Sequence, residues 1–130
     1  MPTRIPNLNY CVKKIEKCTV KRAQHLAVAF TSSGHILCYS VNKGYECIVD
    51  RKNYQNYERF SVHAEQSLID KLQRMKIRER FQKVHLLSIR FCKIKGFCIS
   101  KPCSACQEEI DKFNFSEVYY CDRKGRVVQQ

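Results

Sequence analysis

A chain of 130 residues, of which 44% are hydrophobic, has the size and apolar content of one globular domain, so we expect a single domain over residues 1–130. Its formal net charge of +12 favours a polyanionic partner such as nucleic acid or a nucleotide, although a merely solvated basic surface would have the same composition. No apolar run approaches the roughly 20 residues that a membrane span needs, so we expect no membrane partner.

The nine cysteines are many for this length, but their number is odd, and the first residues, MPTRIPNLNY, contain no apolar stretch like that of a signal peptide. We therefore expect free thiols and a reducing compartment, which makes the location cytoplasmic or otherwise intracellular, a virion included. Most of these cysteines fall within apolar patterns, where a free thiol behaves as a small buried hydrophobe.

The N-terminal part of the chain predicts one helix followed by a hairpin. Residues 8–21 place apolar side chains at helical spacing between basic residues, which favours an amphipathic helix. Residues 24–31 and 36–42 are short runs rich in β-branched and aromatic residues, and the Ser-Ser-Gly sequence between them indicates a turn. Residues 43–60 show no clear period and are predicted to form a loop.

The central part predicts a core helix followed by two extended segments. Apolar side chains recur at helical spacing over residues 63–81, which indicates a helix with one buried face. Residues 84–91 (VHLLSIRF) form a predicted strand, Lys95-Gly96 a turn, and residues 97–100 a short second strand.

The C-terminal part predicts a second core helix and two strands. The helix is expected to begin at Pro102, because proline is well tolerated in a first helical turn. Strands follow over residues 117–121 and 126–129. The four residues between them are too few for a crossover helix, so the last strand is expected to run antiparallel to its neighbour. This order of elements implies an α/β fold with a mixed sheet and helices packed against it.

Two short motifs stand out, and each opens a predicted core helix. The first, SVHAE, spans residues 61–65, and the second, SKPCSAC, spans residues 100–106. An H-x-E motif followed by P-C-x-x-C is the signature of zinc-dependent deaminases, in which the glutamate is the general acid and base. The pattern assigns this catalytic role to Glu65. It assigns one Zn²⁺ ion to three ligands: His63, Cys103 and Cys106.

The spacing of these residues has a chemical reason. Cys103 and Cys106 project from one side of a first helical turn, where the helix dipole favours thiolates. Three protein ligands leave the fourth tetrahedral position for water, as in catalytic zinc sites. Zinc lowers the pKa of such a water from 15.7 to about 7, and Glu65 would carry the proton to the substrate. A structural zinc site stays open as an alternative, with three candidates for a fourth ligand: Cys92, Cys98 and Cys121.

With these motifs the chain resembles the cytidine and deoxycytidylate deaminase superfamily, from the predicted hairpin to the strand that ends at Cys121. The resemblance implies a three-layer cytidine deaminase-like fold, with a mixed five-stranded sheet, helices on both faces and an antiparallel last strand. It also implies a homo-oligomer and one zinc ion per chain. By the same resemblance Asn42 would contact the sugar, the backbone of Ala64 the base edge, and Tyr120 or its neighbour Tyr119 would stack on the base.

The short C-terminal turn resembles that of free-nucleoside deaminases more than the tRNA and polynucleotide branches, which carry a helix there. The resemblance therefore implies a hydrolase that converts cytosine to uracil in a free nucleoside or nucleotide, namely cytidine, deoxycytidine or dCMP. Two departures from the family pattern bear on the substrate. The segment over residues 92–101 is longer than the corresponding segment of the family usually is. Lys101 stands where nucleotide and tRNA deaminases often have Glu.

Two other functions stay open. The positive charge would suit a deaminase that acts on a base within RNA or DNA. Alternatively, the chain keeps the deaminase fold and zinc but binds nucleic acid or serves as a virion component, with catalysis reduced or lost. The sequences SKPC and VYYCD look like those of deaminase-like proteins of large DNA viruses. The remaining histidines lie in strand or turn patterns and are assigned a structural role: His25, His35 and His85.

Overall fold

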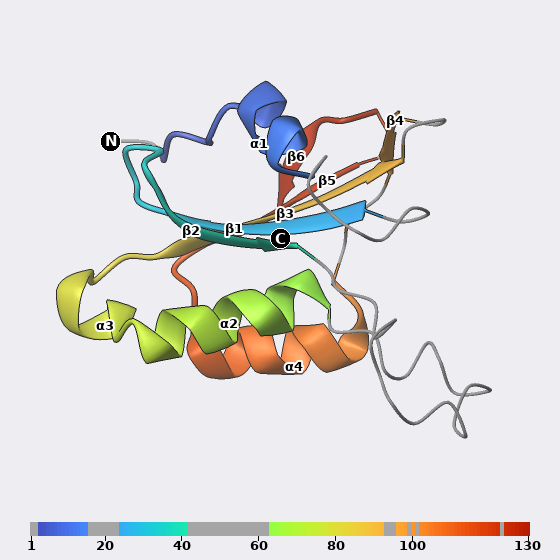
Figure 1. The fold of residues 1–130 in the computed structure, drawn as a ribbon. Helices are drawn as coiled ribbons and strands as arrows, with labels where there is room; N and C mark the ends of the chain where they lie inside the picture. The colour runs from blue at the N-terminus through green and yellow to red at the C-terminus, as the bar shows by residue number, and fades with distance from the viewer. Residues whose placement is uncertain are drawn as a thin grey trace, which may run out of the picture.

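The computed structural model of the chain describes residues 3–15, 24–41, 63–92, 96–98, 100, 102–122 and 124–130. The described helices are α1 (Leu8–Ile15), α2 (Ala64–Arg74), α3 (Ile77–Arg80) and α4 (Ser104–Phe113). The described strands, drawn as arrows in Figure 1, are β1 (Gln24–Phe30), β2 (Ile36–Val41), β3 (His85–Cys92), β4 (Gly96–Cys98), β5 (Val118–Cys121) and β6 (Val127–Gln129).

One mixed sheet runs through the middle of the molecule in the strand order β2-β1-β3-β5-β6, with β4 paired to β3 outside this order. β1 is antiparallel to both β2 and β3, whereas β3 and β5 are parallel. β6 returns antiparallel to β5 through a turn in which Gly125 has a φ of 78°, a conformation that glycine adopts without strain. The predicted mixed sheet is confirmed, and so is the antiparallel last strand.

Helices cover both faces of this sheet (Figure 1). α1 lies on one face, and α2 and α4 lie side by side on the other. Successive side chains of a strand point to opposite faces, so β1 serves two separate cores. Leu26 and Val28 belong to the core on the α1 side, whereas Ala27 and Ala29 face α2. The small alanine side chains allow α2 to lie close to the sheet.

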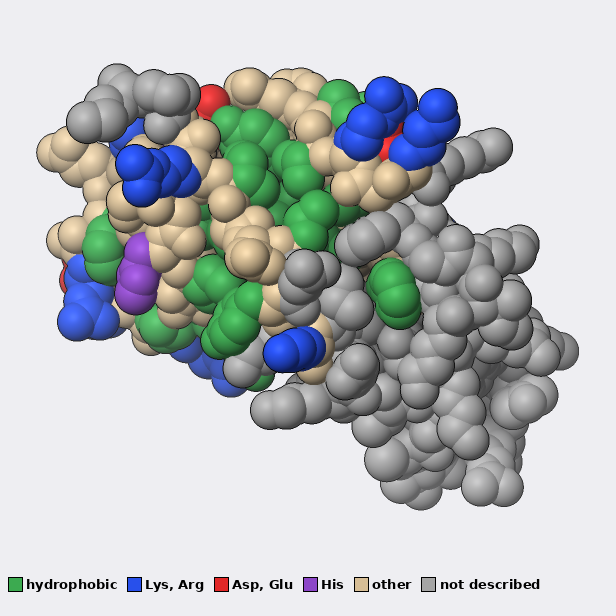
Figure 2. Space-filling view, turned by 90° about the horizontal axis from the view of Figure 1, so that it is seen from above, with side chains coloured by type: hydrophobic (Ala, Val, Ile, Leu, Met, Phe, Trp, Pro, Cys, Tyr) green, Lys and Arg blue, Asp and Glu red, His purple; other side chains and the backbone are tan. Residues whose placement is uncertain are grey.

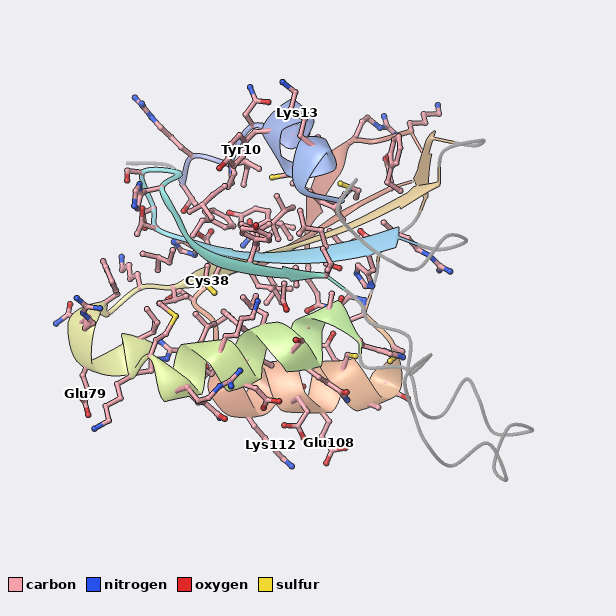
Figure 3. The ribbon with its side chains drawn as sticks, viewed as in Figure 1. Tyr10, Lys13, Cys38, Glu79, Glu108 and Lys112 are labelled. Carbon is pink, nitrogen blue, oxygen red and sulfur yellow. The ribbon has the colours of Figure 1, made fainter. Side chains whose placement is uncertain are left out.

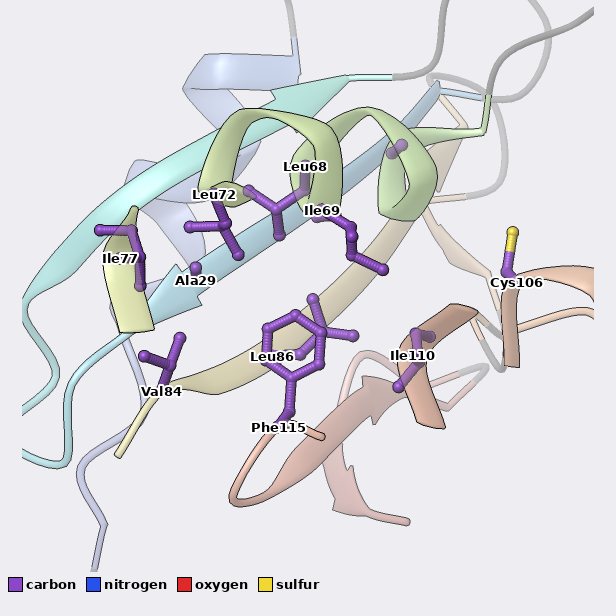
Figure 4. Close-up of a cluster of buried hydrophobic side chains, with 12 residues drawn as sticks. Ala29, Leu68, Ile69, Leu72, Ile77, Val84, Leu86, Cys106, Ile110 and Phe115 are labelled. Carbon is purple, nitrogen blue, oxygen red and sulfur yellow. The ribbon is translucent and has the colours of Figure 1, made fainter. Parts of the chain in front are cut away.

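The core between the sheet and the helix pair fixes α2 against α4 (Figure 4). Leu68 and Leu72 of α2 lie one helical turn apart and are fully buried with Leu86 of β3 and Ile110 of α4. Burying each of these side chains contributes about 1.5–3 kcal/mol. Cys106 stands at the end of this core, at the first turn of α4. The packing therefore holds the starts of the two helices in a fixed relation.

The opposite face of the molecule, seen from the α1 side, has hydrophobic side chains at its centre and clusters of Lys and Arg near its edges (Figure 2). Tyr10 of α1 and Val128 of β6 are among the exposed hydrophobic residues, whereas Cys11, the next residue of α1, is buried in the core between the helix and the sheet. None of the described helices is long and apolar enough to cross a membrane.

The structure corrects the sequence prediction at the two core helices. The helix predicted over residues 63–81 is divided, because Lys76 adopts a left-handed conformation with a φ of 52° between α2 and α3. This turn brings Ile77 into the core, where its burial favours the break. The second core helix begins at Ser104 rather than at Pro102, with Cys103 as its N-cap.

Other sequence predictions fall on residues that the structure does not describe. They are the loop over residues 43–60, the end of the first helix beyond Ile15, and the turn residue Lys95.

Candidate metal centre

The starts of α2 and α4 lie together at one end of the molecule (Figure 1). His63 is the N-cap residue of α2 and Cys103 that of α4, and Cys106 follows within the first turn of α4. The outer side of α4 is charged: Glu108 and Lys112 point away from the sheet and form an ion pair of 3.6 Å (Figure 3). Charged residues outside and core residues inside orient the helix so that its first turn meets that of α2.

The predicted ligand atoms converge. The Nδ1 atom of His63 lies 3.1 Å from the Sγ atom of Cys106 and 3.5 Å from that of Cys103. The three ligand atoms all lie within 4.8 Å of one another. Tetrahedral zinc, with Zn–S distances near 2.3 Å and Zn–N distances near 2.1 Å, places nitrogen and sulfur ligands about 3.6 Å apart. The group has the spacing of a zinc site before any adjustment.

The ligands differ in exposure. Cys106 is buried, His63 is half-buried, and Cys103 is exposed, so the site has a protein side and a solvent side. Burial raises the pKa of the Cys106 thiol, and the adjacent Glu65 carboxylate raises it further. A thiolate at this position therefore needs a nearby positive charge, which a bound divalent cation supplies.

Glu65, in the first turn of α2, is buried with 1% of its surface exposed. Its Oε1 atom lies 2.6 Å from the Nε2 atom of His25 and accepts a hydrogen bond of 3.0 Å from the Ser88 hydroxyl. Burial alone would raise the pKa of this carboxyl group. The hydrogen bonds and the charge of its neighbours, above all His25, outweigh burial and lower the pKa to about 2. Glu65 is therefore a carboxylate at neutral pH.

The second carboxylate oxygen, Oε2, is buried and has no hydrogen-bond partner among the described residues. A buried acceptor without a partner costs about 1–3 kcal/mol, so such an atom normally faces water, an ion or a ligand. The Glu65 carboxylate also lies close enough to Cys106 to change its pKa. A carboxylate with an unpaired oxygen, close to one of three residues that could hold a metal ion, fits a zinc site that retains one position for water.

A buried hydrogen-bond network ties this carboxylate to the sheet and to the cysteine motif. The Ser88 hydroxyl lies 3.0 Å from the backbone oxygen of Ser100, and the Ser100 hydroxyl donates to the backbone oxygen of Ser88 at 2.6 Å. Ser100 also accepts from the backbone N–H of Cys121 at 2.7 Å. Because Ser100 begins the motif that contains Cys103, the network positions ligand and carboxylate together.

Other predicted site residues are distributed less tightly. Ala64 is fully buried as the first residue of α2, directly between the predicted ligand His63 and Glu65. Tyr120 is half-buried and pairs in register with Ser88, so it shares the sheet face of the metal centre. Tyr119 points to the other face, where its ring packs 6.0 Å from that of Phe30. This separates the two tyrosines and leaves Tyr120 as the residue on the site's side.

The structure leaves several of the predicted residues undescribed. Asn42 and Lys101 lie outside the described residues. Of the candidates for a fourth zinc ligand, Cys121 is buried in the α1-side core and does not join the three-residue group, while the side chains of Cys92 and Cys98 are not described.

Sequence reasoning missed two residues of the site. It assigns His25 a structural role without a partner, whereas the structure places its ring against Glu65, and it does not single out Ser88 at all. The alternation along QHLAVAF places His25 on the same strand face as Ala27 and Ala29, the face that α2 covers. That signal shows where His25 points, but the strand register is needed to show what it meets.

No protein-family model and no curated protein sequence matches this chain.

Proposed function

We propose that this protein is a zinc-dependent hydrolytic deaminase that converts cytosine to uracil in a free nucleoside or nucleotide. One observation carries the proposal: the Glu65 carboxylate lies close to Cys106, one of three residues that can hold a metal ion, and its buried Oε2 atom has no partner among the described residues. A closed structural zinc site has no use for such a carboxylate, whereas a hydrolytic site needs a proton carrier beside its water.

The residues present would divide the reaction as follows. His63, Cys103 and Cys106 would hold the metal. Zinc, when bound, supplies a Lewis acid that lowers the pKa of water to about 7. Glu65 Oε2 would accept a proton from the water that attacks C4 of cytosine. The same atom would deliver that proton to the ring nitrogen, then take the second proton from the hydroxyl group formed at C4 and deliver it to the departing amine, so that ammonia leaves and a C4 carbonyl remains.

The arrangement of elements supports a cytidine deaminase-like fold for the same proposal. The mixed sheet has helices on both faces, and the two ligand-bearing helices start side by side at the metal centre. The antiparallel β6 is the feature that the resemblance links to free-nucleoside deaminases rather than to the polynucleotide branch.

Within this proposal, Arg90 favours a phosphorylated substrate over a nucleoside. Arg90 is exposed near the end of β3, pairs in register with His25, and shares the sheet face of Ser88. It has no ion-pair partner among the described residues. An arginine at this position can bind a phosphate group with charge-assisted hydrogen bonds worth about 1.5–3 kcal/mol. Arg90→Ala should therefore reduce kcat/KM for dCMP about 10- to 100-fold and leave that for deoxycytidine nearly unchanged.

An activity screen of the full chain tests the proposed reaction. Cytidine, deoxycytidine, dCMP and single-stranded DNA are each incubated with the protein, ammonia and uracil products are measured, and bound zinc is determined in the same preparation. We expect conversion of a free nucleoside or nucleotide by the wild type and none by Glu65→Ala, which should keep its zinc. Full activity in Glu65→Ala, or no conversion of any substrate by the zinc-loaded wild type, would overturn the proposal.

A second candidate function, binding of nucleic acid without catalysis, is favoured by the exposed basic residues around α3. They are Arg74, Lys76, Arg80 and Lys83. Binding of labelled single-stranded DNA at increasing salt tests this role, because neutralised phosphates make affinity fall steeply with salt concentration. Charge reversal at Lys76 and Lys83 should flatten that salt dependence if this surface binds the backbone. An unchanged salt dependence in this variant would show that these residues do not bind the nucleic-acid backbone.

A further inference from the structure

We infer that His25 is a positioning residue for Glu65: it holds the Oε1 atom of the carboxylate and so directs the other oxygen, Oε2, towards the metal centre. The inference rests on the proposed function in one respect, since it gives the contact a role in catalysis. The contact itself is a feature of the structure, with 2.6 Å between His25 Nε2 and Glu65 Oε1.

Glu65 Oε1, His25 Nε2 and the Ser88 hydroxyl oxygen form a closed triangle. His25 Nε2 lies 2.6 Å from the Ser88 hydroxyl oxygen as well as from Oε1, and the Ser88 hydroxyl lies 3.0 Å from Oε1. A carboxylate can only accept hydrogen bonds, so a hydrogen bond between His25 and Oε1 requires a proton on Nε2. The tautomer or charge state of His25 that serves here is one with a proton on Nε2.

The two donors converge on a single oxygen, and this selectivity distinguishes positioning from simple neutralisation. A network that only compensated a buried charge would satisfy both oxygens, because each unsatisfied buried acceptor is costly. Here Oε1 is contacted by two groups that can donate, His25 and Ser88, whereas Oε2 has no hydrogen-bond partner among the described residues. The arrangement fixes the rotation of the carboxylate and keeps one oxygen available.

The support for His25 comes from the sheet rather than from the helix that carries Glu65. β1 is hydrogen-bonded to β2 on one side and β3 on the other, and Leu26, the next residue, is fully buried. In contrast, the side chain of His63 makes no capping hydrogen bond at the start of α2. A rigid strand therefore holds a carboxylate that its own helix start would hold less firmly.

Three variants of the full chain test the role of His25. His25→Leu removes the donor, His25→Gln keeps an N–H at a similar distance from the backbone, and His35→Leu removes an exposed histidine as the matched control. We expect His25→Leu to lower kcat about 10- to 100-fold on the substrate identified above, with KM and zinc content unchanged. His25→Gln should recover most of the loss, and His35→Leu should match the wild type.

A readout without catalysis separates this inference from the proposed reaction. The ring Nε2–H signal of His25 is followed by ¹⁵N NMR in the zinc-loaded wild type and in Glu65→Gln. We expect a slowly exchanging signal that shifts strongly when Glu65 is replaced. If no substrate is deaminated, the proposed reaction fails, and the ring signal alone decides whether His25 holds Glu65. Wild-type kcat in His25→Leu, or a ring signal that does not respond to Glu65→Gln, would overturn the inference.

Discussion

Two histidine–glutamate pairs lie at opposite ends of the same sheet and differ in which partner is buried. At the metal centre Glu65 is 1% exposed and His25 17%, with 2.6 Å between Oε1 and Nε2. At the far end His85 is 2% exposed and Glu117 27%, with 3.2 Å between Nδ1 and Oε1. The antiparallel register of β1 and β3 sets them apart, because His25 faces Arg90 and His85 faces Phe30.

The two pairs differ in whether burial or the neighbouring groups decide the charge state of the buried partner. Glu65 keeps its charge, because neighbouring donors hold its pKa near 2 despite burial. His85 is pushed the other way: burial lowers its pKa, and the nearby Glu117 carboxylate only partly opposes this. The first pair thus buries an ionised carboxylate, and the second buries a histidine that favours the neutral form.

The two glutamates also differ in what is left unpaired. Glu117 accepts hydrogen bonds from the Thr3 hydroxyl, from the Tyr119 hydroxyl at 3.0 Å and from the Gln129 amide at 3.3 Å, so both of its oxygens are engaged. Glu65 engages only Oε1 with the described residues. We therefore interpret the His85–Glu117 pair as a structural contact that holds the N-terminal segment, and the His25–Glu65 pair as part of a reactive site.

The largest effect is expected from disrupting the metal ligands. Cys106→Ala, or treatment of the wild type with a strong chelator, should lower Tm by roughly 10 °C or more and abolish activity, because metal binding contributes directly to folding. Cys38→Ala, which replaces a half-buried thiol outside the ligand group, is the matched control and should keep its zinc. Thermal unfolding followed by circular dichroism measures the shift. An unchanged Tm in Cys106→Ala would show that zinc binding does not stabilise the fold.

The next effect contrasts the two glutamates directly. Glu65→Gln should reduce kcat by a factor of about 10² to 10⁴, the usual contribution of a proton-transfer group, while zinc stays bound. Glu117→Gln should leave kcat within about twofold but cost about 1–3 kcal/mol of unfolding free energy. Steady-state kinetics and urea unfolding on both variants provide the comparison. Equal losses of activity in the two variants would erase the distinction between the pairs.

A smaller effect concerns the pH dependence of stability. The pKa of His85 is lower in the folded than in the unfolded chain, so the unfolded state binds more protons below about pH 6.5. Stability should therefore fall as pH decreases from about 7.5 to 5.5, by at most about 1.4 kcal/mol per pH unit from this residue. His85→Gln should reduce that slope. Urea unfolding across this pH range measures it, and an identical slope in both proteins would contradict a buried, neutral His85.

The smallest effect compares the serines that accompany the two pairs. Ser32 lies 2.9 Å from His85 Nε2, and Ser32→Ala should cost only about 0.5–1.5 kcal/mol without changing activity. Ser88→Ala should lower kcat as well, because it removes one of the two donors to Glu65. Parallel kinetics and unfolding measurements distinguish the two. A Ser88→Ala protein with wild-type kcat would show that His25 alone suffices to hold the carboxylate.

The sequence predicts the ligand group well because its information is local. Cys103 and Cys106 are one helical turn apart, and His63 and Glu65 are close in sequence, so each pair is a local pattern, and the zinc deaminase signature joins the two pairs into one site. The order of predicted helices and strands likewise predicts the mixed sheet, and the short turn before β6 predicts its antiparallel last strand.

The residues that complete the site depend on tertiary structure. His25, Ser88 and Glu65 lie far apart in the chain and meet only because the register pairs β1 with β3 beneath the start of α2. No local pattern fixes that register. The break at Lys76 has a similar origin: the period of apolar residues continues through it, and only the position of Ile77 in the core explains the turn.

The most direct test of the metal centre is the zinc content of the purified full chain. It is measured by elemental analysis after dialysis that removes weakly bound metal. The ligand geometry predicts one zinc per chain in the wild type, the same content in Glu65→Ala, and loss of zinc in Cys106→Ala. A folded wild-type protein that holds no zinc when zinc is supplied in excess would contradict the site on which the proposed function depends.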